Sequence, residues 1–78
     1  MQLHSLGAHL RNARKHRFPA DDMRAFALRV GVSRATLQKM EQGDLSVSMS
    51  RYYQAAKLLG CERHFEDLFE MPKSLFDD

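Results

Sequence analysis

The segment RVGVSRATLQKMEQG, residues 29–43, contains a glycine, a serine two residues later and then a short run with one apolar edge. Leu37 and Met40 form that edge at helical spacing. Ser33 is suited to cap the start of a helix, and Gly31 is suited to the left-handed position just past the end of the preceding one. The segment therefore predicts a short helix with one buried edge and one polar edge that projects outward.

A second amphipathic stretch precedes this segment and predicts a helix packed against it. Asp22 is suited to cap that helix. Four apolar residues follow it at helical spacing: Met23, Phe26, Ala27 and Val30. The small side chain of Ala27 lets two short helices cross closely. Residues 22–42 thus predict a helix-turn-helix, and a projecting helix of this size fits the major groove of B-DNA, which is about 12 Å wide.

Three further helices are expected, and no run alternates with a convincing period of two, so we expect no sheet. The expected helices run from about Ser5, as N-cap, to His16; from Ser48, as N-cap, to Gly60; and from Glu62 to Glu70. Their apolar residues are Leu3, Leu6, Leu10 and Ala13 for the first, Tyr52, Ala55, Ala56 and Leu59 for the second, and Phe65, Leu68 and Phe69 for the third. The predicted fold is all-α with five helices.

The size and charge of the chain favour one small domain, residues 1–78, with a basic surface. Residues 1–57 contain ten Lys/Arg and four Asp/Glu, whereas residues 58–78 contain two Lys/Arg and six Asp/Glu. This asymmetry favours a nucleic-acid-binding face with an acidic part held away from it. Chance variation in a short chain is the alternative.

The sequence offers little that is typical of an enzyme or of a metal site. The four histidines do not share a suitable face, and Cys61 has no partner at ligand spacing. No nucleophile motif and no phosphate-binding glycine loop is present. We therefore expect no catalysis, metal, cofactor or small-molecule ligand. No run resembles a signal peptide or a membrane span, so we expect a cytoplasmic protein.

The segment MRAFALRVGVSRATLQKMEQ resembles the helix-turn-helix of the lambda-repressor-like (XRE/Cro) family of bacterial and phage DNA-binding proteins. Ala27, Gly31 and Leu37 stand at the positions that carry the likeness. LGAHLRNAR before it, Glu41-x-Gly43 after it and the ending AAKLLG also resemble that family. The likeness covers roughly residues 5–69 and implies a nucleoid-associated DNA-binding protein. Met23 departs from the family's usual Gln, and the loop RFPADD is longer than usual.

The resemblance implies which side chains meet DNA. Base edges are expected to face Arg34, Ala35, Gln38 and Lys39. Arg34 suits guanine, Gln38 suits adenine and the Ala35 methyl suits thymine. The phosphate candidates are Arg24, Ser33, Gln42, Ser48 and Arg51. The alternatives are that the helix face is an ordinary solvated surface, and that Ser33 and Ser48 are simple caps.

One structural ion pair is also implied by the resemblance. Glu41 follows the apolar residues Leu37 and Met40, where a lone carboxylate is unfavourable. Family members pair this glutamate with an arginine of the first helix, for which Arg14 is the best match and Arg11 the alternative.

The C-terminal part, residues 62–78, is expected to form a homodimer or partner interface. Leu58 is predicted to fall opposite its helix's buried stripe, as Leu28 does on the second helix. The expected interface consists of Leu58, Phe65, Leu68, Phe69 and Phe76. The alternative is that these side chains only close the core of the monomer.

These features predict a transcriptional regulator that binds double-stranded DNA, most simply a repressor acting as a dimer on a palindromic operator. Two alternatives remain. One is an antitoxin that holds a toxin protein, because GDLSVSMSRYYQAAKLLG and LFE…LFDD bear a weaker resemblance to HipB-type partners of HipA-type kinases. The other is a restriction-modification controller protein of similar size and fold.

Overall fold

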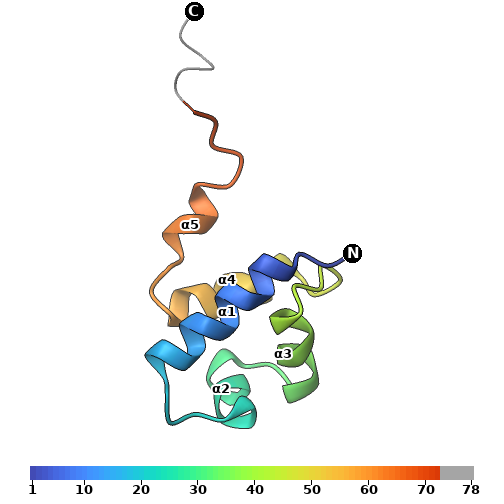
Figure 1. Cartoon of the computed structure of the whole chain (residues 1–78), viewed down its shortest axis with the longest axis vertical. Helices are drawn as coiled ribbons and strands as arrows, with labels where there is room; N and C mark the ends of the chain where they lie inside the picture. The colour runs from blue at the N-terminus through green and yellow to red at the C-terminus, as the bar shows by residue number, and fades with distance from the viewer. Residues whose placement is uncertain (73–78) are drawn as a thin grey trace, which may run out of the picture.

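The computed structural model describes residues 1–72, and Phe76 of the expected interface lies outside them. The described part is all-α, as predicted, with an isolated bridge between Gln2 and Asp44 in place of any strand. Its five helices are α1 (His4–Arg17), α2 (Met23–Val30), α3 (Arg34–Glu41), α4 (Met49–Leu58) and α5 (Arg63–Glu66). Helices α1 to α4 form a bundle, and α5 projects from it (Figure 1). No helix in residues 1–72 is long and apolar enough to cross a membrane.

The core of the bundle is built from the apolar stripes that the sequence predicts. Phe26, Leu37 and Met40 are its largest fully buried side chains. Around them lie Leu10 from α1, Ala27 and Val30 from α2, and Tyr52 and Ala55 from α4. Met23, Val32 and Leu59 are partly buried and pack against this cluster. Helix α3 therefore has one face fixed in the core.

Helix α1 crosses the end of α3 at a distance that only glycine permits. A Cβ atom on Gly7 would lie 2.3 Å from the carbonyl oxygen of Glu41. Gly43 has a φ of 72° and would place a Cβ only 1.8 Å from the carbonyl oxygen of Leu3. The Leu3 amide donates to the Gly43 carbonyl at 2.8 Å. These contacts hold the N-terminal segment against the end of α3.

Two predicted caps differ from the structure. Helix α1 begins one residue early, with Leu3 at the N-cap position and no side-chain cap, so Ser5 lies inside the first turn. Ser48 does occupy the N-cap position of α4 but caps no amide. Its hydroxyl bonds the Ser50 hydroxyl at 3.0 Å instead. The Ser48 hydroxyl therefore contacts Ser50 and no backbone amide of the first turn.

The C-terminal predictions need larger corrections. Leu58 does not fall opposite the buried stripe but packs against the core as a partly buried residue at the last position of α4. Helix α5 is a single turn that ends at Glu66 rather than Glu70. Phe69 has a left-handed φ of 69°, which is incompatible with a continuing helix. Phe65, Leu68 and Phe69 consequently do not form one helical face.

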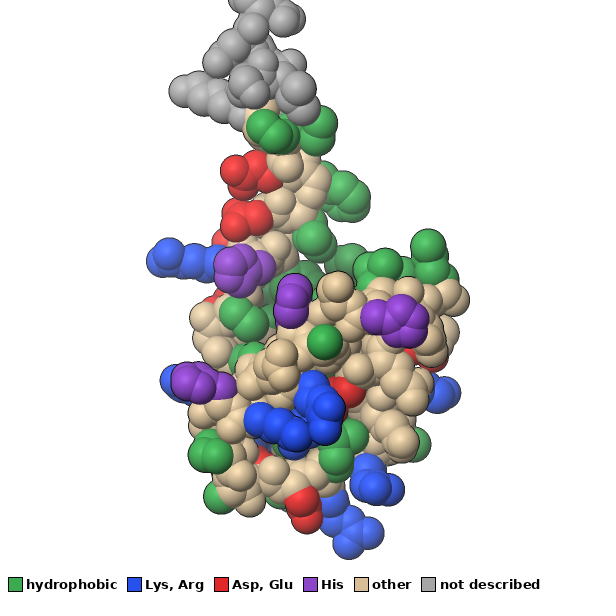
Figure 2. All heavy atoms as spheres, in the orientation of Figure 1, with side chains coloured by type: hydrophobic (Ala, Val, Ile, Leu, Met, Phe, Trp, Pro, Cys, Tyr) green, Lys and Arg blue, Asp and Glu red, His purple; other side chains and the backbone are tan. Residues whose placement is uncertain are grey.

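The segment from α5 to residue 72 forms an arm that leaves the bundle (Figure 1). Phe65, at its base, is partly buried and stacks edge-on against Tyr53, with ring centroids 5.6 Å apart. Beyond it, Leu68, Phe69 and Met71 are exposed. Figure 2 shows hydrophobic side chains along the arm and at the nearby corner of the bundle. The arm is therefore anchored through Phe65 and exposes both apolar and acidic side chains beyond it.

Candidate nucleic-acid interface

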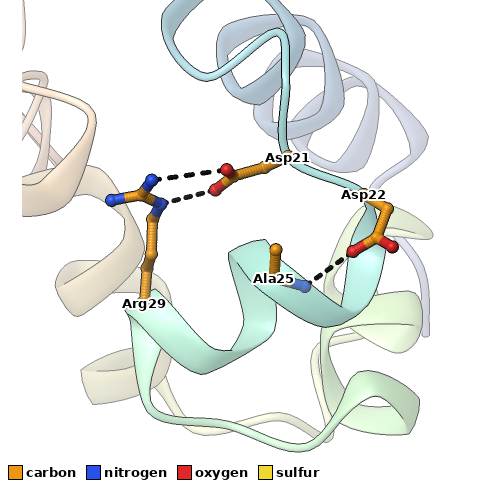
Figure 3. A network of polar contacts seen from close by, with 4 residues as sticks. All are labelled: Asp21, Asp22, Ala25 and Arg29. Atoms are coloured by element: carbon orange, nitrogen blue, oxygen red, sulfur yellow. Dashed lines mark hydrogen bonds and ion pairs between the residues drawn. The ribbon is translucent and has the colours of Figure 1, made fainter.

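The start of α2 is fixed by a cap and by an ion pair on the preceding loop (Figure 3). The Asp22 carboxylate accepts from the Ala25 amide at 2.8 Å, which confirms the predicted cap. The Arg29 guanidinium donates to both oxygens of Asp21 and lies 4.4 Å from the ring centroid of Phe18. Hydrogen bonding to Asp21 raises the pKa of Arg29. The loop before α2 is thus tied to the end of the same helix.

The turn between α2 and α3 is closed by backbone hydrogen bonds and braced from α4. Gly31 has a φ of 86°, the predicted left-handed position. The amides of Gly31 and Val32 both donate to the Ala27 carbonyl, at 2.9 and 3.0 Å. The Arg51 guanidinium donates to the Gly31 carbonyl at 3.3 Å. Arg51 therefore connects α4 to the turn.

Helix α3 begins at a capped end. The Ser33 hydroxyl accepts from the Thr36 amide at 3.0 Å, as predicted, and also bonds the Thr36 hydroxyl. Because Leu37 and Met40 point into the core, the residues on the other side of the helix point to solvent. The orientation of α3 is therefore set by both its cap and its buried face.

The four residues expected to read bases form one exposed edge of α3: Arg34, Ala35, Gln38 and Lys39. Within residues 1–72, the side chains of Arg34, Gln38 and Lys39 make no hydrogen bond or ion pair with the rest of the chain. Their donors and acceptors are thus available for another molecule. Nothing among the described residues covers this edge.

The expected phosphate-binding residues surround this helix. Arg24, Gln42, Ser48 and Arg51 are all exposed, from the first turn of α2 to the first turn of α4. Ser33 is exposed as well, but its hydroxyl is engaged in the cap. Met23, which replaces the family's usual Gln, is partly buried against the core and presents no donor. Arg24 is the cation nearest to it in sequence and lies on the surface.

Arg14 and Glu41 form a buried ion pair between α1 and the last residue of α3. Arg14 Nε donates to Glu41 Oε2 at 2.6 Å, and a second nitrogen donates to Oε1 at 3.3 Å. Their side chains are 7% and 9% exposed, respectively. The partner of Glu41 is therefore Arg14 and not Arg11. The pair fixes α1 against the C-terminal end of α3, whereas the turn lies at its N-terminal end.

The loop after α3 contributes a further fixed point. The Asp44 carboxylate accepts from the Ser46 amide at 2.8 Å, and this hydrogen bond is the main cause that lowers the pKa of Asp44. The Tyr52 hydroxyl donates to the Asp44 carbonyl at 2.7 Å. Burial, together with the charge of Asp44, raises the pKa of Tyr52. The loop from α3 to α4 is thus held by both its own turn and α4.

Sequence reasoning did not identify three of these supports. The Arg51–Gly31 and Tyr52–Asp44 bonds connect α4 to the turn and to the α3–α4 loop, and the Arg29–Asp21 pair connects α2 to the loop before it. The spacing Asp44-x-Ser46 is a turn signal that was available in the sequence. Among residues 1–72 no three His, Cys, Asp or Glu residues are grouped so that they could hold a metal ion.

Comparison with known families agrees with this geometry. A helix-turn-helix family model matches residues 22–65, which run from the N-cap of α2 into α5 and contain the turn, α3 and α4. The chain belongs to the lambda-repressor-like (XRE/Cro) helix-turn-helix family of DNA-binding proteins. It is thus a DNA-binding protein of the kind that regulates transcription. Comparison with curated proteins and with solved structures finds no match.

Proposed function

We propose that this protein is a transcriptional repressor that binds a palindromic operator as a homodimer, on the nucleoid of a bacterial or phage-infected cell. The observation that carries the proposal is the outward edge of α3, whose polar side chains have no partner among residues 1–72. An edge held rigidly by the core on its other side can enter a major groove without rearrangement. Specific binding then depends on the side chains along it.

The base-reading roles follow from the chemistry of the edge. Arg34 at the start of α3 can donate two hydrogen bonds to the O6 and N7 atoms of guanine, and Gln38, one turn later, can pair with adenine. Between them the Ala35 methyl suits contact with a thymine methyl, and Lys39 suits a guanine or a phosphate. Arg24, Ser33, Gln42, Ser48 and Arg51 would fix the register on the phosphates.

Dimerisation is supported by the size of the module. A single module of this kind buries about 600–1,000 Å² of its surface on DNA, which limits the affinity of a monomer. A two-fold dimer presents two α3 helices to half-sites one helical turn apart, roughly 34 Å. A bound dimer that overlaps a promoter excludes polymerase, which is the simplest form of repression.

The test is a footprint on the DNA upstream of the protein's own gene, followed by substitution of Arg34. Arg34→Ala should weaken specific binding by about 1–3 kcal/mol and relax the preference at one base pair. Arg63→Ala, on α5, is the matched control because it removes an exposed arginine far from α3 in sequence. An unchanged operator preference for Arg34→Ala would exclude this assignment of the base-reading edge.

An antitoxin role is the second candidate, and the exposed apolar arm favours it. Phe69 and Met71 offer a surface that a toxin protein of the HipA type could cover while α3 binds the operator. Purification of the chain from its native host should then recover a stoichiometric partner encoded beside it. A chain that purifies alone supports the stand-alone repressor.

A further inference from the structure

A groove with a predominantly apolar lining lies at the inner corner between the arm and the bundle. It encloses about 440 Å³ and receives side chains from the N-terminal segment, α1, the α3–α4 loop, α4 and α5. The bundle side includes Leu3, Leu45 and Met49, which are all exposed large hydrophobic residues. Leu68 of the arm forms the opposite wall. Figure 2 shows these two apolar surfaces on either side of a notch.

The tip of the arm exposes an apolar side chain that is not buried within its own molecule. Phe69 is 94% exposed, the largest value among the large hydrophobic residues of the described part. Its left-handed backbone turns the chain away at that point, and Met71 beyond it is exposed as well. The molecule therefore displays both an apolar groove and an apolar arm.

We propose that the groove receives the arm of a second copy of this chain, with Phe69 as the anchor, so that two molecules exchange arms around a two-fold axis. A two-fold arrangement repeats the same arm-to-groove contact twice and closes on itself, which leaves neither surface exposed. This inference names the interface of the dimer and rests on the proposed function for its biological role.

Charge complementarity favours a second copy as the occupant. The arm, residues 63–72, contains one arginine and three Asp/Glu, a formal charge of −2, whereas residues 1–57, which contain the bundle, have a formal charge of +6. Glu66, Asp67 and Glu70 lie on the arm beside its apolar residues. The arm and the bundle thus have opposite net charges, so the arm of one molecule is attracted to the bundle of the other.

The arrangement also accounts for the extent of exposed apolar surface near the N-terminus. Leu3 and Leu45 lie on two neighbouring segments of backbone. The Leu3 amide donates to the Gly43 carbonyl, and the Leu45 amide donates to the Met1 carbonyl. This backbone pairing fixes the floor of the groove in place. A preformed groove binds an apolar anchor with little loss of conformational entropy.

The experiment uses two full-length variants, one on each side of the proposed contact, and sedimentation without DNA. Phe69→Asp removes the anchor, and Met49→Asp places a carboxylate in the groove at the first residue of α4, where a negative charge suits the helix. Each variant alone should dissociate about tenfold or more readily than wild type, since an unpaired carboxylate is unfavourable in an apolar contact. Leu28→Asp, at an isolated leucine that is 82% exposed on α2, is the matched control and should remain dimeric.

Mixing the two variants is the decisive measurement. A mixed pair retains one intact contact, between the wild-type arm of the Met49→Asp chain and the wild-type groove of the Phe69→Asp chain, so dimers should reappear. Three outcomes would overturn the inference. The first is a dimer that Met49→Asp does not weaken, which would mean that the two arms pair with each other. The second is a monomeric wild type, whose arm would be covered by its own groove or by another protein. The third is that mixing the two variants restores no dimer. Far-ultraviolet circular dichroism of each variant establishes that it is folded.

Operator binding, measured separately, keeps this inference distinct from the proposed function. A wild-type monomer that binds its operator overturns the arm exchange and leaves the DNA-binding role in place. A dimer that shows complementation and has no preference for any DNA site overturns the repressor and leaves the arm exchange in place.

Discussion

The helix-turn-helix and the C-terminal arm differ in how many independent contacts fix them. Helix α3 is held by a cap at Ser33, by two fully buried side chains and by the ion pair at Glu41. The arm has one aromatic contact, at Phe65, and then exposed apolar residues. A helix held at both ends and along one face presents its outer edge in a defined geometry, as base reading requires. The arm has few fixing contacts and exposes apolar side chains, which suits a segment that packs against another molecule.

The largest expected effect comes from breaking the ion pair that fixes the end of α3. Glu41→Ala should lower the free energy of unfolding by about 3–5 kcal/mol, because the Arg14 guanidinium is left buried without its partner. Urea denaturation measures the change. The double variant Arg14→Met/Glu41→Leu is the control and should recover most of the loss, since both charges are removed. A small loss for Glu41→Ala would show that α3 is not held at this end.

A matched pair of leucine truncations compares the two regions directly. Leu37→Ala in α3 should lower the free energy of unfolding by about 2–5 kcal/mol, since it leaves a cavity in the core. Leu68→Ala in the arm, where the side chain is 46% exposed, should cost the monomer less than about 1 kcal/mol. Thermal and chemical denaturation at low protein concentration measure both. Equal losses would remove the distinction between the regions.

A pair of serine substitutions sharpens the comparison at the level of single caps. Ser33→Ala should destabilise the protein by about 1 kcal/mol, because the Thr36 amide loses its acceptor. Ser48→Ala occupies the same position on α4 and should have little effect on stability, because its side chain caps no amide. Denaturation midpoints of the two variants measure the difference. A loss at Ser48 as large as that at Ser33 would contradict the capping seen here.

The smallest expected effect is a pH dependence of stability that arises in the loop after α3. The Ser46 hydrogen bonds lower the pKa of Asp44 below its value in the unfolded chain, so the charged form stabilises the fold. This stabilisation is present above the unfolded pKa of about 3.9 and is lost as the pH falls through the lower pKa of the folded state. The melting temperature should therefore drop less steeply below about pH 4 for Asp44→Asn than for wild type. Parallel pH profiles would show that Asp44 does not contribute.

The sequence predicted the bundle well because its signals are local. The caps at Asp22 and Ser33, the stop at Gly31 and the apolar stripe of α2 each act over a few residues, and the structure contains them all. The outer edge of α3 was predicted as exposed for the same reason. Helical periodicity divides such a helix into a buried face and a solvent face.

The predictions failed where the outcome depends on contacts that local spacing does not reveal. Phe65, Leu68 and Phe69 have helical spacing, yet α5 ends after one turn and Phe69 adopts a left-handed backbone. A short isolated helix gains little from propensity and depends on packing, which the arm lacks beyond Phe65. Leu58 shows the reverse, because the packing of the helices brings the core against a side chain expected to face solvent.

By itself, the sequence determined the helices of the bundle, the family and the residues along the outer edge of α3, because periodicity, caps and glycines act within one turn of helix. Only the tertiary structure decided that Arg51 braces the turn, that Tyr52 fixes the loop after α3, and that an apolar groove lies beside a projecting arm. Those features join residues that belong to different helices and loops. Their existence depends on how the helices pack, and packing is settled by the whole core together.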